Sequence, residues 1–153
     1  MKLEPLKQWI CDACGGIIEK SEDGWWEFIE TKDNLVYGDR IVHCGNDSNC
    51  YYNEQALRGE GKIVGSLPLG QILGAGGLGH MLHRLELSQQ VQGKTEERFN
   101  MQDYVDIMRR LYLPYWEEAR LYWERARRDG FHDACDFSEQ ELVRIINEYA
   151  ENG

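Results

Sequence analysis

The chain has 153 residues, of which 42% are hydrophobic, and it includes five Trp and eight Tyr. This length and composition predict a folded chain, either one domain or a small module joined to a modest one, and argue against disorder. The 17 basic and 27 acidic residues give a formal net charge of -10, which disfavours nucleic-acid binding because such binding depends on a basic field.

The cysteine count and the first residues indicate a cytoplasmic protein. Five Cys is an odd number, and residues 1–5 are not an apolar signal sequence, so thiolates on a metal are expected rather than disulfides. The uncharged run from Ile63 to His83 is interrupted by glycines and a proline, so we expect no membrane span.

The first elements expected in the chain are two strands. Residues 24–30 alternate large apolar and acidic side chains after Trp25, which is typical of a half-buried strand. Asp33 and Asn34 predict a turn, and residues 40–44 form a second strand. The hairpin would carry one cysteine pair back towards the other.

Four cysteines in the first third of the chain predict a metal site. Cys11 and Cys14 form a C-x-x-C turn followed by Gly15, and a second loop about thirty residues later carries Cys44 and Cys50. Two such loops complete a tetrahedral thiolate set, which predicts one structural Zn²⁺ per chain. A closed set of four ligands leaves no position for substrate.

The fourth ligand is either His43 or Cys44. These neighbours point to opposite faces of an extended segment, so only one is expected to bind. Cys44 followed by Gly45 repeats the pattern at Cys14, which favours sulfur, while a site with three Cys and His43 remains open. Residues 11–50 resemble zinc ribbons and zinc knuckles in general, and such sites are expected to stabilise the fold through metal binding.

The middle of the chain is rich in glycine. Residues 63–73 are apolar, with Pro68 suited to the first turn of a short helix, and residues 77–91 have helical spacing. Residues 74–80 match G-x-G-x-x-G and look similar to the glycine turn of zinc-containing alcohol dehydrogenases. That turn requires a preceding strand and further βαβ strands, which are missing here, so a tight glycine loop at a helix start is predicted.

A histidine pair on the same predicted helix offers a weaker metal motif. His80 and His83 are three residues apart and Glu86 lies one turn further, but the H-E-x-x-H pattern is absent. We interpret them as a polar helix flank. His132 and Cys135, near the turn between the last two helices, have less support as a site, and Cys135 is assigned to packing.

Three more helices are expected after a polar linker at residues 92–97. Asn100 caps the first, Pro114 begins a long helix that continues to Arg128, and Ser138 with Glu141 forms a capping box for the last. The long helix has charged residues predicted to form a solvated face and an aromatic stripe predicted to be core, with an exposed binding surface as the alternative. The stripe contains Tyr115, Trp116, Tyr122 and Trp123, and the charged residues are Glu117, Glu118, Arg120, Glu124 and Arg128.

The predicted fold is α+β, with a zinc-binding β-rich module at residues 1–58 and an all-helical region of about four helices at residues 63–153. The leading functional hypothesis is a cytoplasmic protein-interaction or regulatory module with a structural zinc site, whose partner is another protein. The alternatives are a nucleic-acid-binding zinc ribbon and a small enzyme using His80, His83 and the glycine loop. No catalytic motif is present, so no catalytic residue is assigned. The nucleic-acid alternative requires a local basic face from Arg109, Arg110, Arg120, Arg125, Arg127 and Arg128.

Overall fold

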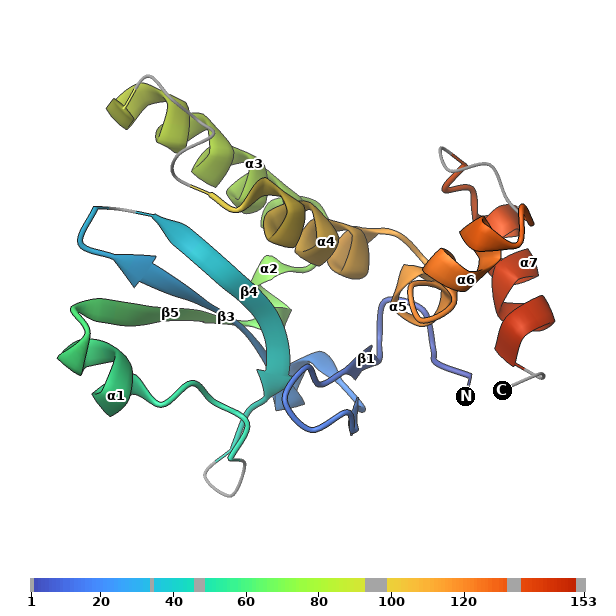
Figure 1. Cartoon of the computed structure of the whole chain (residues 1–153), viewed down its shortest axis with the longest axis horizontal. Helices are drawn as coiled ribbons and strands as arrows, with labels where there is room; N and C mark the ends of the chain where they lie inside the picture. The colour runs from blue at the N-terminus through green and yellow to red at the C-terminus, as the bar shows by residue number, and fades with distance from the viewer. Residues whose placement is uncertain (1, 34, 46–48, 93–98, 132–135, 151–153) are drawn as a thin grey trace.

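The computed structural model describes residues 2–33, 35–45, 49–92, 99–131 and 136–150, with the side chains of residues 87–92 left aside. The fold is mixed α+β, as predicted: small antiparallel sheets form from the N-terminal part and most helices follow them (Figure 1). No helix of the described ranges combines the length and the apolar character needed to cross a membrane.

Two antiparallel sheets are built from five strands. β1 (Trp9–Ile10) and β2 (Ile17–Ile18) pair around the first cysteine turn. β3 (Gly24–Thr31) and β4 (Val36–His43) form the predicted hairpin, and β5 (Lys62–Pro68) pairs with the other edge of β3. The order β4-β3-β5 places the hairpin strand that carries His43 at one edge.

Strand β5 lies where sequence reasoning expected only an apolar stretch and a helical region. Ile63, Val64 and Leu67 are good strand formers, but Gly65 and Pro68 obscure the pattern. Gly65 is required by packing, because a Cβ there would lie 2.3 Å from the Phe28 ring. The N-terminal sheet therefore includes a strand from beyond residue 58.

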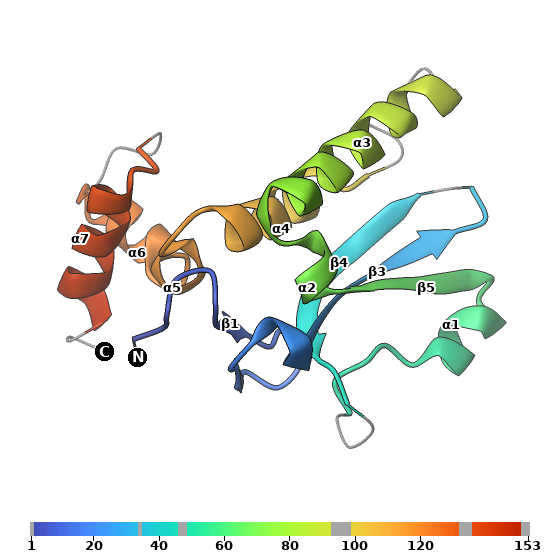
Figure 2. The same ribbon diagram turned by 180° about the vertical axis from the view of Figure 1, so that it is seen from behind.

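The helices form two groups (Figures 1 and 2). α3 and α4 cover one face of the three-stranded sheet, α1 lies on the other side, and α5, α6 and α7 gather at the far end of the molecule. The bounds are η1 (Ser21–Asp23), α1 (Glu54–Gly59), α2 (Leu69–Ile72), α3 (Gly74–Gln92), α4 (Met101–Tyr112), α5 (Trp116–Ala119), α6 (Trp123–Arg128) and α7 (Glu139–Ala150).

The main core lies between the sheet and α4. Trp26 and Ile41 are fully buried and join the same cluster as Tyr104 and Ile107 of α4. The opposite face of β3 was expected to carry exposed acidic side chains, but Glu27 is only 1% exposed. It is covered because it forms an ion pair with Arg40 and accepts a hydrogen bond from the Tyr52 amide.

The predicted caps of two C-terminal helices are confirmed. The Asn100 side chain accepts hydrogen bonds from the second and third amides of α4. At α7, Ser138 Oγ accepts from the Glu141 amide at 3.3 Å. The Glu141 carboxylate completes no capping box, because it pairs with Arg144.

The predicted long helix from Pro114 to Arg128 is wrong. Tyr115 has a left-handed backbone with φ of 67°, and residues 120–122 form a turn, so α5 and α6 are separate short helices. Glu117 and Glu118 are buried rather than solvated. Their partners, described below, include Arg110 of α4 and the distant amides of Leu3 and Ile10, which the spacing within one helix cannot reveal.

The aromatic stripe forms a second core among α5, α6 and α7. The Trp116 side chain is 3% exposed, and its ring meets Trp123 at a centroid distance of 4.9 Å. Both rings also contact Phe137. The aromatic stripe therefore lies largely in the core, which agrees with the prediction that it is core rather than an exposed binding surface.

Candidate metal centre

Four side chains from three segments meet near the C-terminal end of strand β4. Cys11 and Cys14 lie in the turn between β1 and β2, His43 ends β4, and Cys50 precedes α1. One ligand atom from each lies within 4.8 Å of all the others. The group therefore can hold a metal ion, and it is the one such cluster of Cys, His, Asp and Glu found among the described residues.

The turn at Cys11 presents two sulfurs in one direction. The Cys11 amide donates to Gly16 O at 2.8 Å, and the Gly15 amide donates to Cys11 O at 2.8 Å. The Gly16 amide lies 3.4 Å from Cys14 Sγ and donates to it. Gly15 has φ of 72°, and a Cβ on Gly16 would lie 3.3 Å from Cys14 Sγ, so the Gly-Gly pair fits this turn.

His43 is oriented as a ligand by a second contact. Its Nε2 lies 3.1 Å from Ile17 O, so an N–H at Nε2 donates there and the lone pair of the neutral ring is at Nδ1. Nδ1 lies 3.4 Å from Cys14 Sγ. Zinc–sulfur and zinc–nitrogen bonds of about 2.3 and 2.0 Å at a tetrahedral angle place S and N about 3.5 Å apart. The observed spacing is close to that of a zinc site.

Cys44 lies outside this group. Its Sγ donates a hydrogen bond to Glu22 O at 2.9 Å. Burial, with a contribution from the Asp23 carboxylate, raises the pKa of the Cys44 thiol and favours the protonated donor. The glycine pattern favoured Cys44 as fourth ligand, whereas the geometry assembles His43 with Cys11, Cys14 and Cys50.

The thiols of the cluster influence each other's ionisation. Burial opposes ionisation of Cys11, but hydrogen bonds from the backbone at Cys14, His43 and Ala13 outweigh it and lower its pKa to about 6. Burial and the neighbouring Cys11 and Cys14 sulfurs raise the pKa of Cys50 to about 11. A bound cation would relieve the repulsion among the thiolates, which is why metal binding releases protons from such sets.

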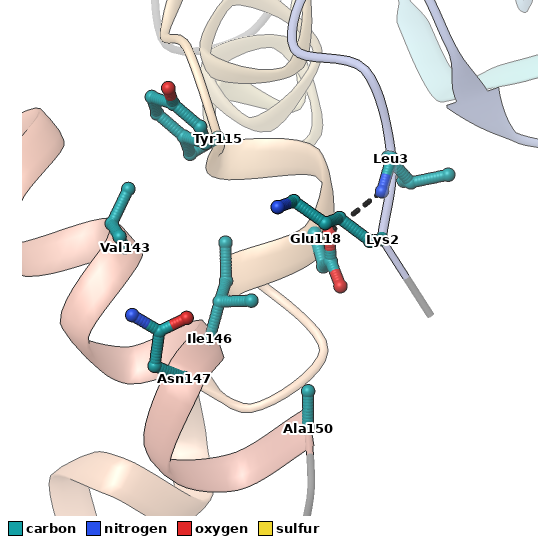
Figure 3. A pocket seen from close by; sticks show the side chains of 8 residues that line it. All are labelled: Lys2, Leu3, Tyr115, Glu118, Val143, Ile146, Asn147 and Ala150. Atoms are coloured by element: carbon teal, nitrogen blue, oxygen red, sulfur yellow. Dashed lines mark hydrogen bonds between the residues drawn. The ribbon is translucent and has the colours of Figure 1, made fainter.

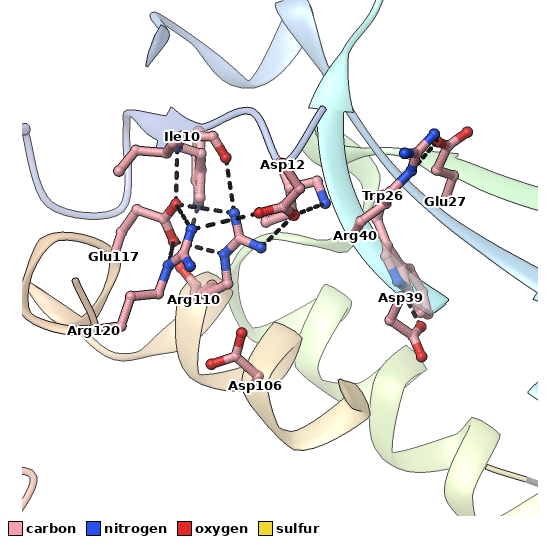
Figure 4. Close-up of polar contacts among 12 residues, drawn as sticks. Ile10, Asp12, Trp26, Glu27, Asp39, Arg40, Asp106, Arg110, Glu117 and Arg120 are labelled. Atoms are coloured by element: carbon pink, nitrogen blue, oxygen red, sulfur yellow. Dashed lines mark hydrogen bonds and ion pairs between the residues drawn. The ribbon is translucent and has the colours of Figure 1, made fainter. Parts of the chain in front are cut away.

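Asp12, which follows Cys11 in the first cysteine turn, fixes that turn to the sheet. The Asp12 amide donates to Ile41 O at 2.8 Å, and Asp12 Oδ2 accepts from the Ile41 amide at 2.7 Å. The same Oδ2 accepts from Arg110 Nη1 at 2.6 Å (Figure 4). A turn on one sheet is thereby joined both to β4 and to α4.

Arg110 connects the metal centre with the C-terminal helices. It is 2% exposed, and it pairs with Glu117 through Nε at 2.7 Å and Nη2 at 3.0 Å. Its Nη2 also donates to Ile10 O, and the Ile10 amide donates to Glu117 Oε1 (Figure 4). Arg120 adds a second cation beside Asp12 and Glu117, so two cations face two carboxylates. Sequence reasoning missed this network. The one sign in the sequence was that the apolar face predicted for this helix did not explain the position of the charged residue Arg110.

A second set of contacts supports Cys50. Arg40 forms an ion pair with Glu27, and its Nη2 donates to Cys50 O at 2.9 Å. The Arg40 guanidinium lies 3.5 Å from the centroid of the Tyr52 ring. These contacts hold the loop of the fourth ligand against β3 and β4.

The glycine run does not form a nucleotide-binding turn. Residues 74–80 belong to the start of α3, and the preceding element is the four-residue helix α2. Gly77 is needed for packing, because a Cβ there would lie 2.0 Å from the backbone of Ile72. The close packing agrees with the prediction, whereas the predicted glycine loop is instead the first part of α3 itself.

The histidine pair of α3 stays at the surface. His80 is exposed, and His83 Nδ1 lies 3.4 Å from Glu86 Oε2 with both side chains more than half exposed. His80 and His83 do not form a described metal cluster. His132 and Cys135 lie outside the described residues.

Two of the larger cavities among the described residues lie outside the metal cluster. One, of about 450 Å³, separates α7 from residues 2–3, and Leu3 N donates to Glu118 Oε2 at 2.9 Å at its edge (Figure 3). Tyr115, Ile146 and Asn147 line its other sides. The second, of about 500 Å³, lies beside the metal centre and has aromatic and acidic residues in its lining.

Comparison with known proteins gives no relative. No protein-family model, no curated protein and no solved structure matches this chain. Its function therefore has to be argued from the site itself.

Proposed function

We propose that the chain is a zinc-stabilised module that binds another protein in the cytoplasm. The observation that carries the proposal is the convergence of Cys11, Cys14, His43 and Cys50, whose ligand atoms all lie within 4.8 Å of one another. Three thiolates and one imidazole are a donor set suited to zinc, and a complete protein set of four is typical of a structural site.

The contacts around the cluster support a structural role. Asp12 links the first turn to Ile41 and Arg110, while Arg40 holds the loop of Cys50. In structural sites the ion contributes directly to the free energy of folding, because the unfolded chain has no preformed set of ligands. Bound zinc would therefore hold three segments of the β-rich part in one arrangement.

The site and the surface charge favour a binding role over catalysis or nucleic-acid recognition. A closed four-ligand site supplies no open coordination position for a substrate. Three of the six arginines that a nucleic-acid interface would use are engaged internally: Arg110 is buried, Arg120 pairs with Glu117, and Arg109 lies over Trp116 and Phe137. The exposed arginines that remain are those of α6, namely Arg125, Arg127 and Arg128. The net charge of -10 repels phosphate as well.

Elemental analysis of protein purified without added metal tests the metal assignment. The native chain and Cys44→Ser should each contain one zinc per chain, whereas Cys11→Ser and His43→Ala should lose it. Full zinc in His43→Ala together with loss in Cys44→Ser would refute the assignment of the fourth ligand. Absence of any metal in the fresh native protein would refute the zinc site itself.

Binding of a protein partner is tested separately. A partner captured from cytoplasmic extract should be retained by native protein and Cys44→Ser and lost with Cys50→Ser, and the purified pair should then bind directly. Mobility shift at low salt with single- and double-stranded nucleic acid provides the contrast, and a specific shift there would replace the proposed partner class.

A further inference from the structure

The cavity of about 500 Å³ beside the metal centre has the features of a binding site. Its floor comes from β3 and β5, and its walls come from residues 44–45, residues 51–52 and the start of α1. Figure 1 shows α1 on the side of the sheet away from α3 and α4. The residues that matter for the argument are Trp25, Glu27, Val64, Tyr51, Tyr52 and Glu54.

Aromatic rings form an angled wall in this cavity. The Trp25 and Tyr51 rings lie edge to face, with centroids 5.7 Å apart and planes at 62°. Tyr51 is 36% exposed, so part of its side chain is accessible from the cavity opening. Ring faces set at an angle attract cations through their negative π-faces, and Tyr52 already holds the Arg40 guanidinium in this way.

The charges of the lining also favour a cation. Two carboxylates, Glu27 and Glu54, line the cavity, and no Lys or Arg is among its lining residues in the described part of the chain. Glu27 is neutralised by Arg40. Glu54 lies at the surface, paired with Arg58 at 3.0 Å, where solvent screens the pair and leaves its carboxylate available to a second cation.

We propose that this cavity binds an alkylated ammonium group, either on a methylated lysine side chain of a protein or on a free quaternary ammonium ion. An alkylated ammonium group keeps its positive charge but has few N–H donors or none. Ring faces and apolar walls such as Val64 therefore suit it better than a site built only from hydrogen-bond acceptors. The inference rests on the proposed function in one respect: ligation of Cys50 fixes the adjacent Tyr51 and Tyr52.

Titration of the zinc-loaded full chain, followed by the NMR signals of the cavity residues, tests the site. The probes are tetramethylammonium, a peptide with one trimethyllysine, the same peptide with unmodified lysine, and the same peptide with an uncharged tert-butyl analogue. We expect the trimethyllysine peptide to bind at least fivefold more tightly than the tert-butyl peptide, because charge contributes to cation–π binding.

Variants connect the binding to the residues named. Tyr51→Ala should weaken binding about tenfold, whereas Tyr51→Phe keeps the ring and should bind within about twofold of the native chain. Glu54→Gln should weaken binding, while the matched control Glu60→Gln, an exposed carboxylate outside the cavity paired with Lys62, should not. Unchanged zinc content and thermal unfolding would show that each variant folds.

The outcomes separate the two sources and the two proposals. Preference for the trimethyllysine peptide over tetramethylammonium supports a protein source, and equal binding of both supports a free ammonium ion. Equal affinity for the tert-butyl peptide, or no shifts with any probe, would overturn the inference. If zinc is present and no probe binds, this inference fails while the zinc site stands; if zinc is absent, the proposed function fails independently of the titration.

Discussion

Replacement of Arg110 by Met tests whether the buried ionic network joins the metal centre to the helical region. The change removes a guanidinium that is 2% exposed and makes four hydrogen bonds to Asp12, Glu117 and Ile10. The hydrocarbon part of the side chain is largely kept by Met, so the loss is mainly one of charge and hydrogen bonds.

The expected loss of stability follows from the two carboxylates that remain after Arg110 is replaced. Glu117 would be left with Arg120 as its cation, and Asp12, which is 24% exposed at its side chain, would regain water in part. Breaking a buried ion pair by removing one partner costs about 3 to 5 kcal/mol, and the partial compensation by Arg120 places our expectation near the lower figure. A domain of ordinary stability, about 5 to 15 kcal/mol, would lose a substantial fraction of it.

Urea unfolding followed by tryptophan fluorescence measures this loss. Arg58→Met is the matched control, because Arg58 forms an exposed pair with Glu54 and its removal should change the stability by less than about 1 kcal/mol. The double variant Arg110→Met with Glu117→Leu leaves no buried carboxylate at that position and should recover part of the loss. A loss below about 1 kcal/mol in Arg110→Met, or a double variant less stable than either single variant, would refute the reasoning.

Three further predictions concern packing, pH and metal. Gly77→Ala should destabilise the fold by at least about 2 kcal/mol in thermal unfolding, because its Cβ would meet Ile72, whereas Gly76→Ala, with open space around it, should be neutral or stabilising; equal effects would contradict the close approach. Burial raises the pKa of Asp39 from 3.8 to about 6, against the opposing effect of the Trp26 hydrogen bond, so ionisation favours the unfolded chain and stability should fall as the pH rises from about 4 to about 6. Asp39→Asn should therefore be more stable than the native chain at pH 7 by about 2 to 3 kcal/mol and close to it near pH 4, as measured by urea unfolding at both values; a gain independent of pH would contradict this assignment. Chelation of the metal should lower the unfolding temperature of the native chain, and a curve unchanged by chelator would show that the ion contributes nothing to the fold.

Local patterns predicted the elements whose causes are local. The β3–β4 hairpin follows from its alternating apolar residues and intervening turn, and the Asn100 and Ser138 caps follow from side chains that reach amides two or three positions away. The cysteine turn was recognisable because its spacing is dictated by the geometry of a metal ion.

The missed features depend on partners that belong to other elements of the fold. The long helix breaks at Tyr115 and again before α6, where Glu117 and Glu118 turn inwards to Arg110 and to the Leu3 amide. The choice between His43 and Cys44 likewise depends on Ile17 O and Glu22 O, which select the ligand and the bystander. Neither choice is visible in the spacing of the residues concerned.

The separation in sequence between the metal turn and its supports has a consequence for biosynthesis. Asp12 and Ile10 contact Arg110 across 98 and 100 positions, and Leu3 contacts Glu118 across 115. During translation the cysteine-bearing segment leaves the ribosome long before α4 has been synthesised. Its thiols therefore lack these supporting contacts until later in translation. We expect nascent chains that end before Arg110 to be cleaved readily by protease and to become resistant once α4 and α5 have emerged.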